Sequence, residues 1–350
     1  MELASARGKR MQRREFIRGA AATAGLSFIG SAFAQINARS PATKRIALVH
    51  PTEKPEGMTV NGRRGFRAFF EGLNRLGYVE GKNLTVERYS ALGRADHYGD
   101  VARAVVTSQP DLIVVFSGPL ALQFKPLTST IPILSMPADP VVVGLVTNLA
   151  RPGGNFTGVS VDAGFEVWGK RLQFLSETVS NHLTNARYFG GSTTIWWDRA
   201  GAGIQKVAQQ AGIQLAATSL GGNADRATYE LAFDAMSKDR VDGLLVSDAG
   251  EHLTNRQLIV DLAAKHRLPA IYPFREFADV GGLLAYGVDL VDALRRLADM
   301  TDQVLRGAKP ADIPFYQQTK FELVLNRTTA KSFGLEFPTN LLAVADEVVG

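Results

Sequence analysis

The sequence contains no cysteine in its 350 residues. It therefore forms no disulfide bond, carries no lipid-modified cysteine anchor and offers no thiol for chemistry. Its stability must come from packing, and a chain that is 45% hydrophobic and 21% charged has the composition of an ordinary globular protein. A chain of this length can bury one large hydrophobic core or two ordinary ones.

Long hydrophobic runs are also missing after the N-terminal segment. The longest candidate, 141–150, is interrupted by Thr147 and Asn148, whereas a membrane-spanning helix needs roughly 20 apolar residues. We therefore expect the mature chain to be soluble.

The sequence has little net charge once its N-terminal segment is set aside. The whole chain carries a formal charge of +5 and has an isoelectric point near 9.4. Residues 1–34 hold six basic and two acidic side chains, so the remainder has 33 basic against 32 acidic residues. No stripe of Lys and Arg is left to follow a phosphate backbone, and we expect no nucleic-acid partner.

The N-terminal segment has the order of an export signal. Arg13-Arg14-Glu15-Phe16-Ile17-Arg18 is a twin-arginine run, 19–33 is small and apolar, and Ala32-Phe33-Ala34 is a small-x-small cleavage sequence. The alternative interpretation is an N-terminal membrane anchor or an amphipathic helix, but the apolar part is short for a membrane span. We predict a signal peptide over 1–34, a polar linker over 35–43 and a periplasmic product exported by the twin-arginine route.

Common catalytic motifs are absent from the sequence. There is no Gly-x-x-x-x-Gly-Lys-Ser/Thr phosphate loop, no Gly-x-Gly-x-x-Gly after a strand and no Gly-x-Ser-x-Gly nucleophile elbow. The five histidines are scattered without a His-x-x-x-His pair, which argues against a zinc site. We therefore expect no cofactor, no metal and no catalytic residue, and a protein that is not an enzyme.

What the sequence does contain is a long alternation of apolar strands and amphipathic helices. Two runs of five strands meet near Val161, and continuous apolar strands between helices are typical of parallel sheets covered on both faces. The expected strands are 45–50, 84–89, 112–116, 131–136, 156–161, 186–189, 213–219, 243–247, 270–272 and 283–286. Among the expected helices are a short one ending at Leu149, one over 253–266 and one over 289–305, and a late strand follows over 321–325.

This pattern predicts an α/β fold of two doubly wound parallel-sheet lobes joined by a multi-crossing hinge. The predicted N-terminal lobe comprises 44–161 and 288–310, and the predicted C-terminal lobe comprises 162–287 and 311–350. The chain is expected to cross between them near 161–164, 287–289 and 309–314. A hinge with few moving dihedral angles permits rigid-body closure, so we expect a ligand cleft between the lobes.

Polar residues gather where the expected strands end, which is where open α/β sheets bind ligands. The stretch 269–290 is typical of a cleft rim, because a short strand ends at a polar-aromatic turn and Gly281-Gly282 opens the next strand. The candidate ligand-binding residues are Ser117, Gly118, Ala138, Asp139, Ser160, Asp162, Asp248, Phe274 and Glu276.

Within this set, Asp139 and Asp248 are predicted to lie on opposite lobes and to hold an ammonium or hydroxyl group as the lobes close. An equally compatible interpretation makes both of them helix N-caps. Backbone donors at Gly118 suit a carboxylate. Trp196 and Trp197 follow the sixth strand, and they either form a stacking wall or pack in the core or on the outer surface.

Several stretches taken together carry a family resemblance. They are 66–73 (FRAFFEGL), 76–84 (LGYVEGKNL), 131–133 with 138–141, 149–160 (LARPGGNFTGVS), 269–287 and 321–326 with Ala330, Gly334 and Leu335. In these stretches the sequence resembles the ABC transporter substrate-binding proteins of the type I periplasmic-binding fold, in the branch of tryptophan/tyrosine-type binding proteins. The resemblance implies ligand contacts in an interlobe cleft by Ser117, Asp139, Asp248, Phe274 and Glu276. Where that family commonly has an Asn-Pro turn after the sixth strand, this sequence has 190–194 (GGSTT).

These observations predict a periplasmic solute receptor. It would trap a small polar ligand, amino-acid-like or similar, by lobe closure and deliver it as a monomer to an ABC permease in the inner membrane. Two alternatives stay open, since fold alone does not decide function. One is an exported α/β enzyme that uses Asp139 or Asp248 as a base, and the other is the ligand-sensing lobe of a signalling system.

Overall fold

The computed structural model describes residues 43–161, 164–180 and 182–350. The predicted signal peptide over 1–34 and nearly all of the predicted linker over 35–43 lie outside the described residues, as does Asp162. Among the described residues, no helix is long and apolar enough to cross a membrane.

The first sheet is built from six strands in the order β11-β5-β4-β3-β1-β2, and every adjacent pair in it is parallel. Its inner strands are short apolar runs that are buried along their length, as expected for strands covered on both faces. The strands are β1 (Lys44–His50), β2 (Leu84–Ser90), β3 (Leu112–Val115), β4 (Ile133–Ser135), β5 (Phe156–Ser160) and β11 (Tyr316–Gln317).

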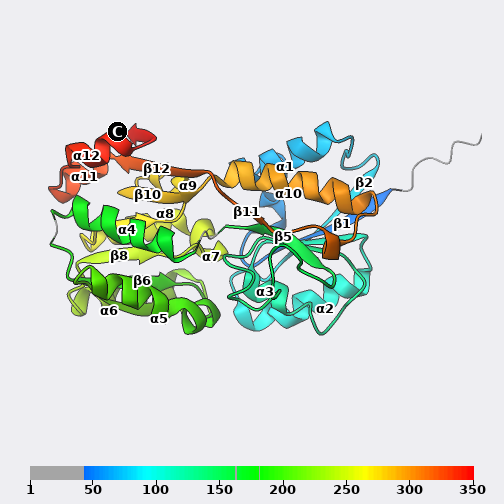
Figure 1. The fold of residues 1–350 in the computed structure, drawn as a ribbon, viewed down its shortest axis with the longest axis horizontal. Coiled ribbons are helices and arrows are strands. Elements are labelled where there is room, and N and C mark those ends of the chain that lie inside the picture. The colour runs from blue at the N-terminus through cyan, green and yellow to red at the C-terminus, as the bar shows by residue number, and fades with distance from the viewer. Residues whose placement is uncertain (1–42, 162–163, 181) are drawn as a thin grey trace, which may run out of the picture. The chain divides into compact units, whose positions relative to one another are not determined.

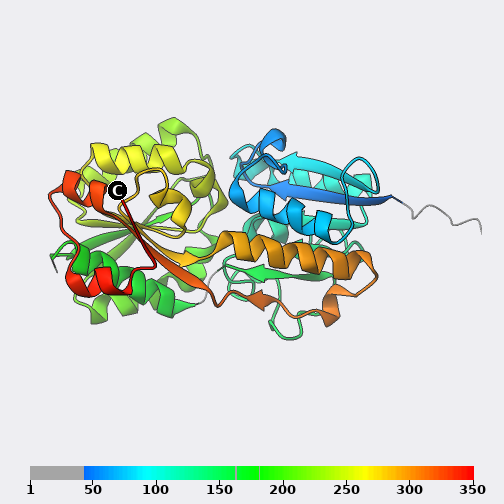
Figure 2. The same cartoon turned by 90° about the horizontal axis from the view of Figure 1, so that it is seen from above.

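Helices cover both faces of this sheet, with a separate apolar core on each side. One face carries α1 (Arg64–Arg75) and α10 (Leu290–Leu305), which lie side by side in Figures 1 and 2. A Cβ atom added to Gly72 would lie 2.7 Å from the Cβ of Ala298. The two helices therefore approach each other so closely at this point that only glycine fits. The other helical elements are η1 (Pro55–Gly57), η2 (Ala95–His97), α2 (Tyr98–Ser108), α3 (Gly118–Leu122) and η3 (Pro310–Asp312).

The second sheet has seven strands in the order β13-β12-β10-β9-β8-β6-β7 and also lies between two apolar cores. Its strands are β6 (Asn185–Gly190), β7 (Gln214–Ser219), β8 (Gly243–Val246), β9 (Ala270–Tyr272), β10 (Leu284–Val288), β12 (Phe321–Asn326) and β13 (Glu347–Val349). Its helices are α4 (Phe165–Thr178), α5 (Ile195–Gln210), α6 (Arg226–Lys238), α7 (Gly250–Thr254), α8 (Arg256–Lys265), α9 (Arg275–Ala278), α11 (Arg327–Phe333) and α12 (Thr339–Val344).

The predicted mixed α/β architecture of two lobes is confirmed, with two differences. β10 and β12 pair antiparallel, because β12 reaches the sheet by a direct return from the first sheet instead of a helical crossover. β11 pairs with β5 of the first sheet, so the third crossing comes after Gln317 and later than the predicted 309–314. We define the N-lobe as 43–161 with 290–317, and the C-lobe as 164–288 with 318–350.

Two predicted helices also differ from the structure. The expected helix over 253–266 is two helices, α7 and α8, separated at Asn255. The expected short helix ending at Leu149 is absent; 140–144 forms a turn and 145–149 is irregular. Asp139 accounts for the start of this turn, because its Oδ1 accepts hydrogen bonds from the amides of Val141 (2.7 Å) and Val142 (3.0 Å).

Candidate functional site

A cavity of about 140 Å³ lies between the two lobes and is lined by residues of both. Its walls come from the segments that follow β1, β3 and β4 in the N-lobe and β6, β8 and β9 in the C-lobe. These are the carboxyl ends of parallel strands, where open α/β sheets bind ligands. A cavity of about 150 Å³ is known to hold a single benzene ring, so this one has room for a small molecule.

Six of the nine predicted ligand-binding residues line this cavity. They are Ser117, Gly118, Ala138, Asp248, Phe274 and Glu276. Asp162 lies outside the described residues. The structure therefore gathers most of the predicted set in one place, and their roles as ligand contacts stay predictions.

The other two predicted residues lie beside the cavity and take local structural roles. Asp139 caps the turn that follows β4, as described above, which is the capping alternative that the sequence left open. Ser160 donates from its Oγ to the carbonyl of Ala138. Ser117 lines the cavity and is also the N-cap of α3, where its Oγ accepts from the amide of Leu120 at 3.4 Å.

Arg63, at the N-cap position of α1, brings a positive charge to the cavity wall. One of its terminal nitrogens pairs with Glu53 at 2.5 Å, and the guanidinium lies 5.6 Å from the ring centre of Phe66. Its other terminal nitrogen, Nη1, is buried and has no hydrogen-bond partner within the described part of the chain. Burial lowers the pKa of Arg63, but a guanidinium stays charged in proteins.

His50 ends β1 and is held in one tautomer by the backbone. Its Nδ1 accepts hydrogen bonds from the amides of Thr52 (3.1 Å) and Glu53 (2.7 Å), so the ring proton must be on Nε2. Burial, together with the nearby charge of Arg63, lowers the pKa of His50 well below its ordinary value. The side chain lines the cavity as a neutral Nε2–H donor.

Glu276, in the first turn of α9, brings a carboxyl group from the C-lobe. Its Oε2 is buried and finds no hydrogen-bond partner among the residues described, and burial raises its pKa. The hydroxyl of Ser247, also on the cavity wall, is likewise buried and unpartnered in 43–161, 164–180 and 182–350. Because buried polar groups are nearly always satisfied, these are the atoms that a molecule bound in the cavity, or a water, would satisfy.

An aromatic group forms another part of the cavity wall. Tyr188 and Trp196 both line it and stack with ring centres 5.5 Å apart and planes 16° apart. Trp197 stacks on Tyr188 at 4.8 Å. Both tryptophans are half-buried and pack against the C-lobe core, but only Trp196 lines the cavity.

The turn after β6 is held in place by hydrogen bonds to a buried carboxylate. Glu251 accepts from both the amide (2.5 Å) and the Oγ (2.7 Å) of Ser192. The next residue, His252, has no solvent exposure; its Nε2 donates to the carbonyl of Phe189 and its Nδ1 accepts from the hydroxyl of Tyr229. This support replaces the Asn-Pro turn that the resemblance led us to expect.

Direct contacts join the lobes around the cavity, so the structure is a closed form. The hydroxyls of Thr52 and Thr254 are 2.9 Å apart, and Arg199 donates to the carbonyl of Val142 at 2.9 Å. Two backbone hydrogen bonds also cross from the segment after β2 to the segment after β7; they run from Ala95 N to Gly222 O (3.1 Å) and from Ala224 N to Gly93 O (3.0 Å).

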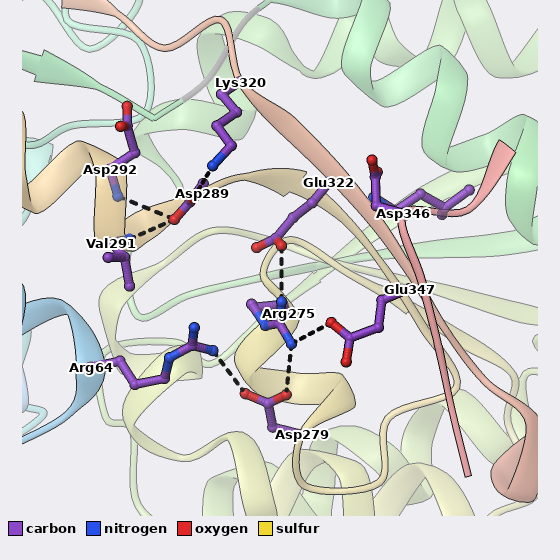
Figure 3. A network of polar contacts seen from close by, with 11 residues as sticks. Arg64, Arg275, Asp279, Asp289, Val291, Asp292, Lys320, Glu322, Asp346 and Glu347 are labelled. Atoms are coloured by element: carbon purple, nitrogen blue, oxygen red, sulfur yellow. Dashed lines mark hydrogen bonds and ion pairs between the residues drawn. The ribbon is translucent and has the colours of Figure 1, made fainter.

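Figure 3 shows an ion-pair network beside the hinge, centred on Arg275. Arg275 pairs with Glu322 (3.2 Å), Glu347 (2.8 Å) and Asp279 (3.6 Å). Asp279 also faces Arg64 of the N-lobe at 3.7 Å. In the same view, Asp289 caps α10 and pairs with Lys320 at 2.8 Å. This ion pair joins the second chain crossing between the lobes, at Asp289, to the third, at Lys320.

Arg63 and His50 line the cavity although neither was among the predicted site residues. A signal for Arg63 was present, because the basic pair Arg63-Arg64 stands at the start of a helix, where the helix dipole disfavours cations. His50 ends the first strand, the position that was used to select the other candidates. It was set aside because a single histidine carries little information by itself.

The lobes, the hinge crossings and the cavity between them define a two-lobed ligand-binding protein. The chain belongs to the ABC transporter substrate binding protein family, whose model matches residues 58–349. The predicted family is therefore confirmed.

Individual relatives are distant in sequence. The chain is 22% identical to a tyrosine-binding protein of Clostridioides difficile over 283 residues, which are 77% of this chain and 76% of that protein. It shares the fold of a conserved domain protein from Vibrio cholerae (TM-score 0.77, 22% identity, 87% of this chain and 99% of that one). It also shares the fold of an ABC domain in complex with L-Trp from Streptococcus pneumonia (TM-score 0.76, 21% identity, 88% of this chain and 100% of that one).

Proposed function

We propose that this protein is the periplasmic receptor of an ABC uptake transporter and takes a small polar, amino-acid-like ligand into the cavity between its lobes. The observation that supports this most is the meeting of two unpartnered, buried charged groups in one cavity. Arg63 comes from the N-lobe and Glu276 from the C-lobe, and the protein itself satisfies neither Nη1 of the first nor Oε2 of the second within the described residues.

A ligand with both an acceptor and a donor would complete both groups at once. It can favour the closed form only if it contacts the two lobes together, because a ligand shifts a conformational equilibrium by its differential affinity for the two states. Binding energy then goes into closure, and no bond is made or broken. A tyrosine-binding relative and a structural neighbour in complex with L-Trp support an amino-acid-like ligand.

The remaining parts of the proposal rest on the sequence. The twin-arginine run and the cleavage sequence within 1–34 support export to the periplasm. From there we infer delivery to an inner-membrane permease, with the receptor acting as a monomer. The family's described role supports a transport partner.

The test is calorimetry and thermal-shift screening of natively purified protein against amino acids, sugars and small carboxylates. We expect saturable binding of at least one amino acid, with L-tyrosine and L-tryptophan as first probes, and no turnover. Asp248→Asn, on the cavity wall, should weaken binding. Asp139→Asn should not, because Asn also serves as a cap. Turnover of a substrate without any saturable binder would refute the proposal.

A further inference from the structure

The walls of the cavity differ in electrostatic character between the lobes. The N-lobe wall presents hydrogen-bond donors and a positive charge, namely the Nη1 atom of Arg63 and the Nε2–H of His50. The C-lobe wall contains the acidic residues Glu276 and Asp248, together with the buried Nε1 donor of Trp196. Acidic side chains of the C-lobe thus lie across the cavity from the arginine of the N-lobe.

The start of α1 adds to the positive side. This helix has 12 residues, its N-cap residue is Arg63 and no side chain caps its first amides. Gly65, in its first turn, lines the cavity. The first amides of a helix have no partner within the helix, and the helix dipole places partial positive charge there.

Hydrogen-bond donors at this corner outnumber the acceptors that the protein supplies. Glu53 is paired with Arg63 and the charge of Glu276 also reaches it, yet the buried Nη1 of Arg63 has no hydrogen-bond partner among the described residues. His50 is locked with its proton on Nε2, so it can only donate toward the cavity. Arg63, His50 and the amide of Gly65 are all hydrogen-bond donors at this corner of the cavity. A carboxylate has two oxygens that can accept hydrogen bonds from them.

We propose that the ligand is a carboxylic acid whose acid group lies at the N-terminus of α1, bound by Arg63 and His50. This rests on the proposed function and adds an orientation to it. The acid group is held by the N-lobe before closure, and the rest of the ligand meets Glu276, Asp248 and the Trp196 wall of the C-lobe. Binding should require the acid group of the ligand, because three hydrogen-bond donors face this part of the cavity.

The experiment compares acids with their amides, which match in size and lack the charge. The probes are L-tyrosine with L-tyrosinamide, L-tryptophan with L-tryptophanamide, and indole-3-acetate with indole-3-acetamide. We expect binding by calorimetry for at least one acid, at least about 10-fold tighter than for its amide, because charge-assisted hydrogen bonds are roughly twice as strong as neutral ones.

Variants assign the effect to this corner of the cavity. Arg63→Gln should weaken binding of the acid by about 10-fold or more and leave that of the amide nearly unchanged, which removes the preference. Arg67 is an exposed arginine on the same helix. Arg67→Gln is therefore the matched control and should keep the preference for acid over amide. Glu276→Gln should also keep the preference for acid over amide. Thermal unfolding of each variant checks that it folds.

The outcomes separate this inference from the proposed function. If amides bind as well as acids, or if sugars bind and no acid does, the acid site is wrong while the receptor function stands. If no acid in the panel shifts the melting temperature at millimolar concentration, the inference is also overturned. If an acid is bound at Arg63 and then converted, the acid site stands and the receptor function falls.

Discussion

The backbone amide of Ala95 in the N-lobe donates a 3.1 Å hydrogen bond to the carbonyl of Gly222 in the C-lobe. With the reciprocal bond from Ala224 to Gly93, it forms a short antiparallel bridge between the lobes. Gly93 and Gly222 have φ angles of +83° and +111°, which a residue with a side chain rarely adopts. We call residues 93–95 with 222–224 the interlobe bridge. It connects the segment after β2 in the N-lobe to the segment after β7 in the C-lobe. Because its two halves belong to different lobes, we expect it to form only in the closed state.

The first prediction is that Ala95→Pro shifts the protein toward an open form. Ala95 is the first residue of η2, where proline is tolerated, and Arg94 before it is extended. The substitution therefore removes mainly the bond to Gly222. Since the chain has no cysteine, dyes on Ala104→Cys and Ala235→Cys can report the lobe separation by energy transfer without ligand. We expect a smaller high-transfer population.

Arg226→Pro is the control for Ala95→Pro. It places proline at the first position of α6, next to the bridge, and Asp225 before it is also extended. It leaves both interlobe bonds in place. An equal shift in the two variants, or none in Ala95→Pro, would mean that the interlobe bridge does not stabilise closure.

The second prediction concerns the stability of the ligand-free protein. Burial raises the pKa of Glu276, so the folded state holds this proton more tightly than the unfolded state does. Stability from this group is present below the unfolded pKa and is lost as pH rises through the folded pKa. Glu276→Gln should therefore raise the melting temperature at pH 7 by about 2 °C, and the gain should shrink toward pH 4. A lower melting temperature at pH 7 would show that the carboxylate is stabilised in a way the structure lacks.

The third prediction separates the two neighbouring tryptophans by fluorescence. Trp196 lines the cavity, whereas Trp197 is half-buried, stacks on Tyr188 and is not part of the cavity lining. Ligand binding should change the emission of the wild-type protein and of Trp197→Phe. Trp196→Phe should lose most of that change. The assignment fails if Trp197→Phe loses the signal instead.

The fourth prediction tests the cap at the second hinge crossing. Burial alone would raise the pKa of Asp289, but Lys320 and the amides of Val291 and Asp292 outweigh it and lower the pKa. Asp289→Ala should cost about 1–2 kcal/mol of unfolding free energy at pH 7 through loss of the cap. The cost should disappear as pH falls through the folded pKa, because the protonated acid no longer holds these partners.

Lys320→Ala tests the ion pair between Lys320 and Asp289 without removing the cap. The lysine side chain is 66% exposed, and solvent screens an exposed ion pair, so its removal should cost clearly less in denaturant unfolding than Asp289→Ala does. Equal costs for the two variants would indicate that the ion pair, and not the cap, stabilises the crossing.

The fold was largely predictable from the sequence because inner strands such as β3 (LIVV) and β8 (GLLV) are buried along their length and appear as uninterrupted apolar runs. The short edge strands β11 and β13 were missed, since two or three residues, partly exposed, leave no periodic pattern. Their positions depend on pairing with β5 and β12, which is tertiary information.

The site was partly predictable for a related reason. Ser117, Asp248 and Glu276 follow buried strands, so strand ends alone placed them at the cavity. The same rule could not distinguish Asp139, because an aspartate after a strand serves equally as a cap or as a ligand contact. Arg63 was missed because it lies thirteen residues beyond its strand, and only the folded loop brings it back.

The N-lobe is discontinuous, because α10 and β11 come after five of the seven strands of the C-lobe sheet. The apolar side of α1, including Phe69 and Leu73, belongs to a core that also contains residues of α10, so this core is incomplete until α10 has left the ribosome. Neither half can then mature alone, and a fragment ending near residue 289 should aggregate rather than fold. Synthesis of the C-terminal segment is therefore a condition for completing the lobe that the ribosome makes first.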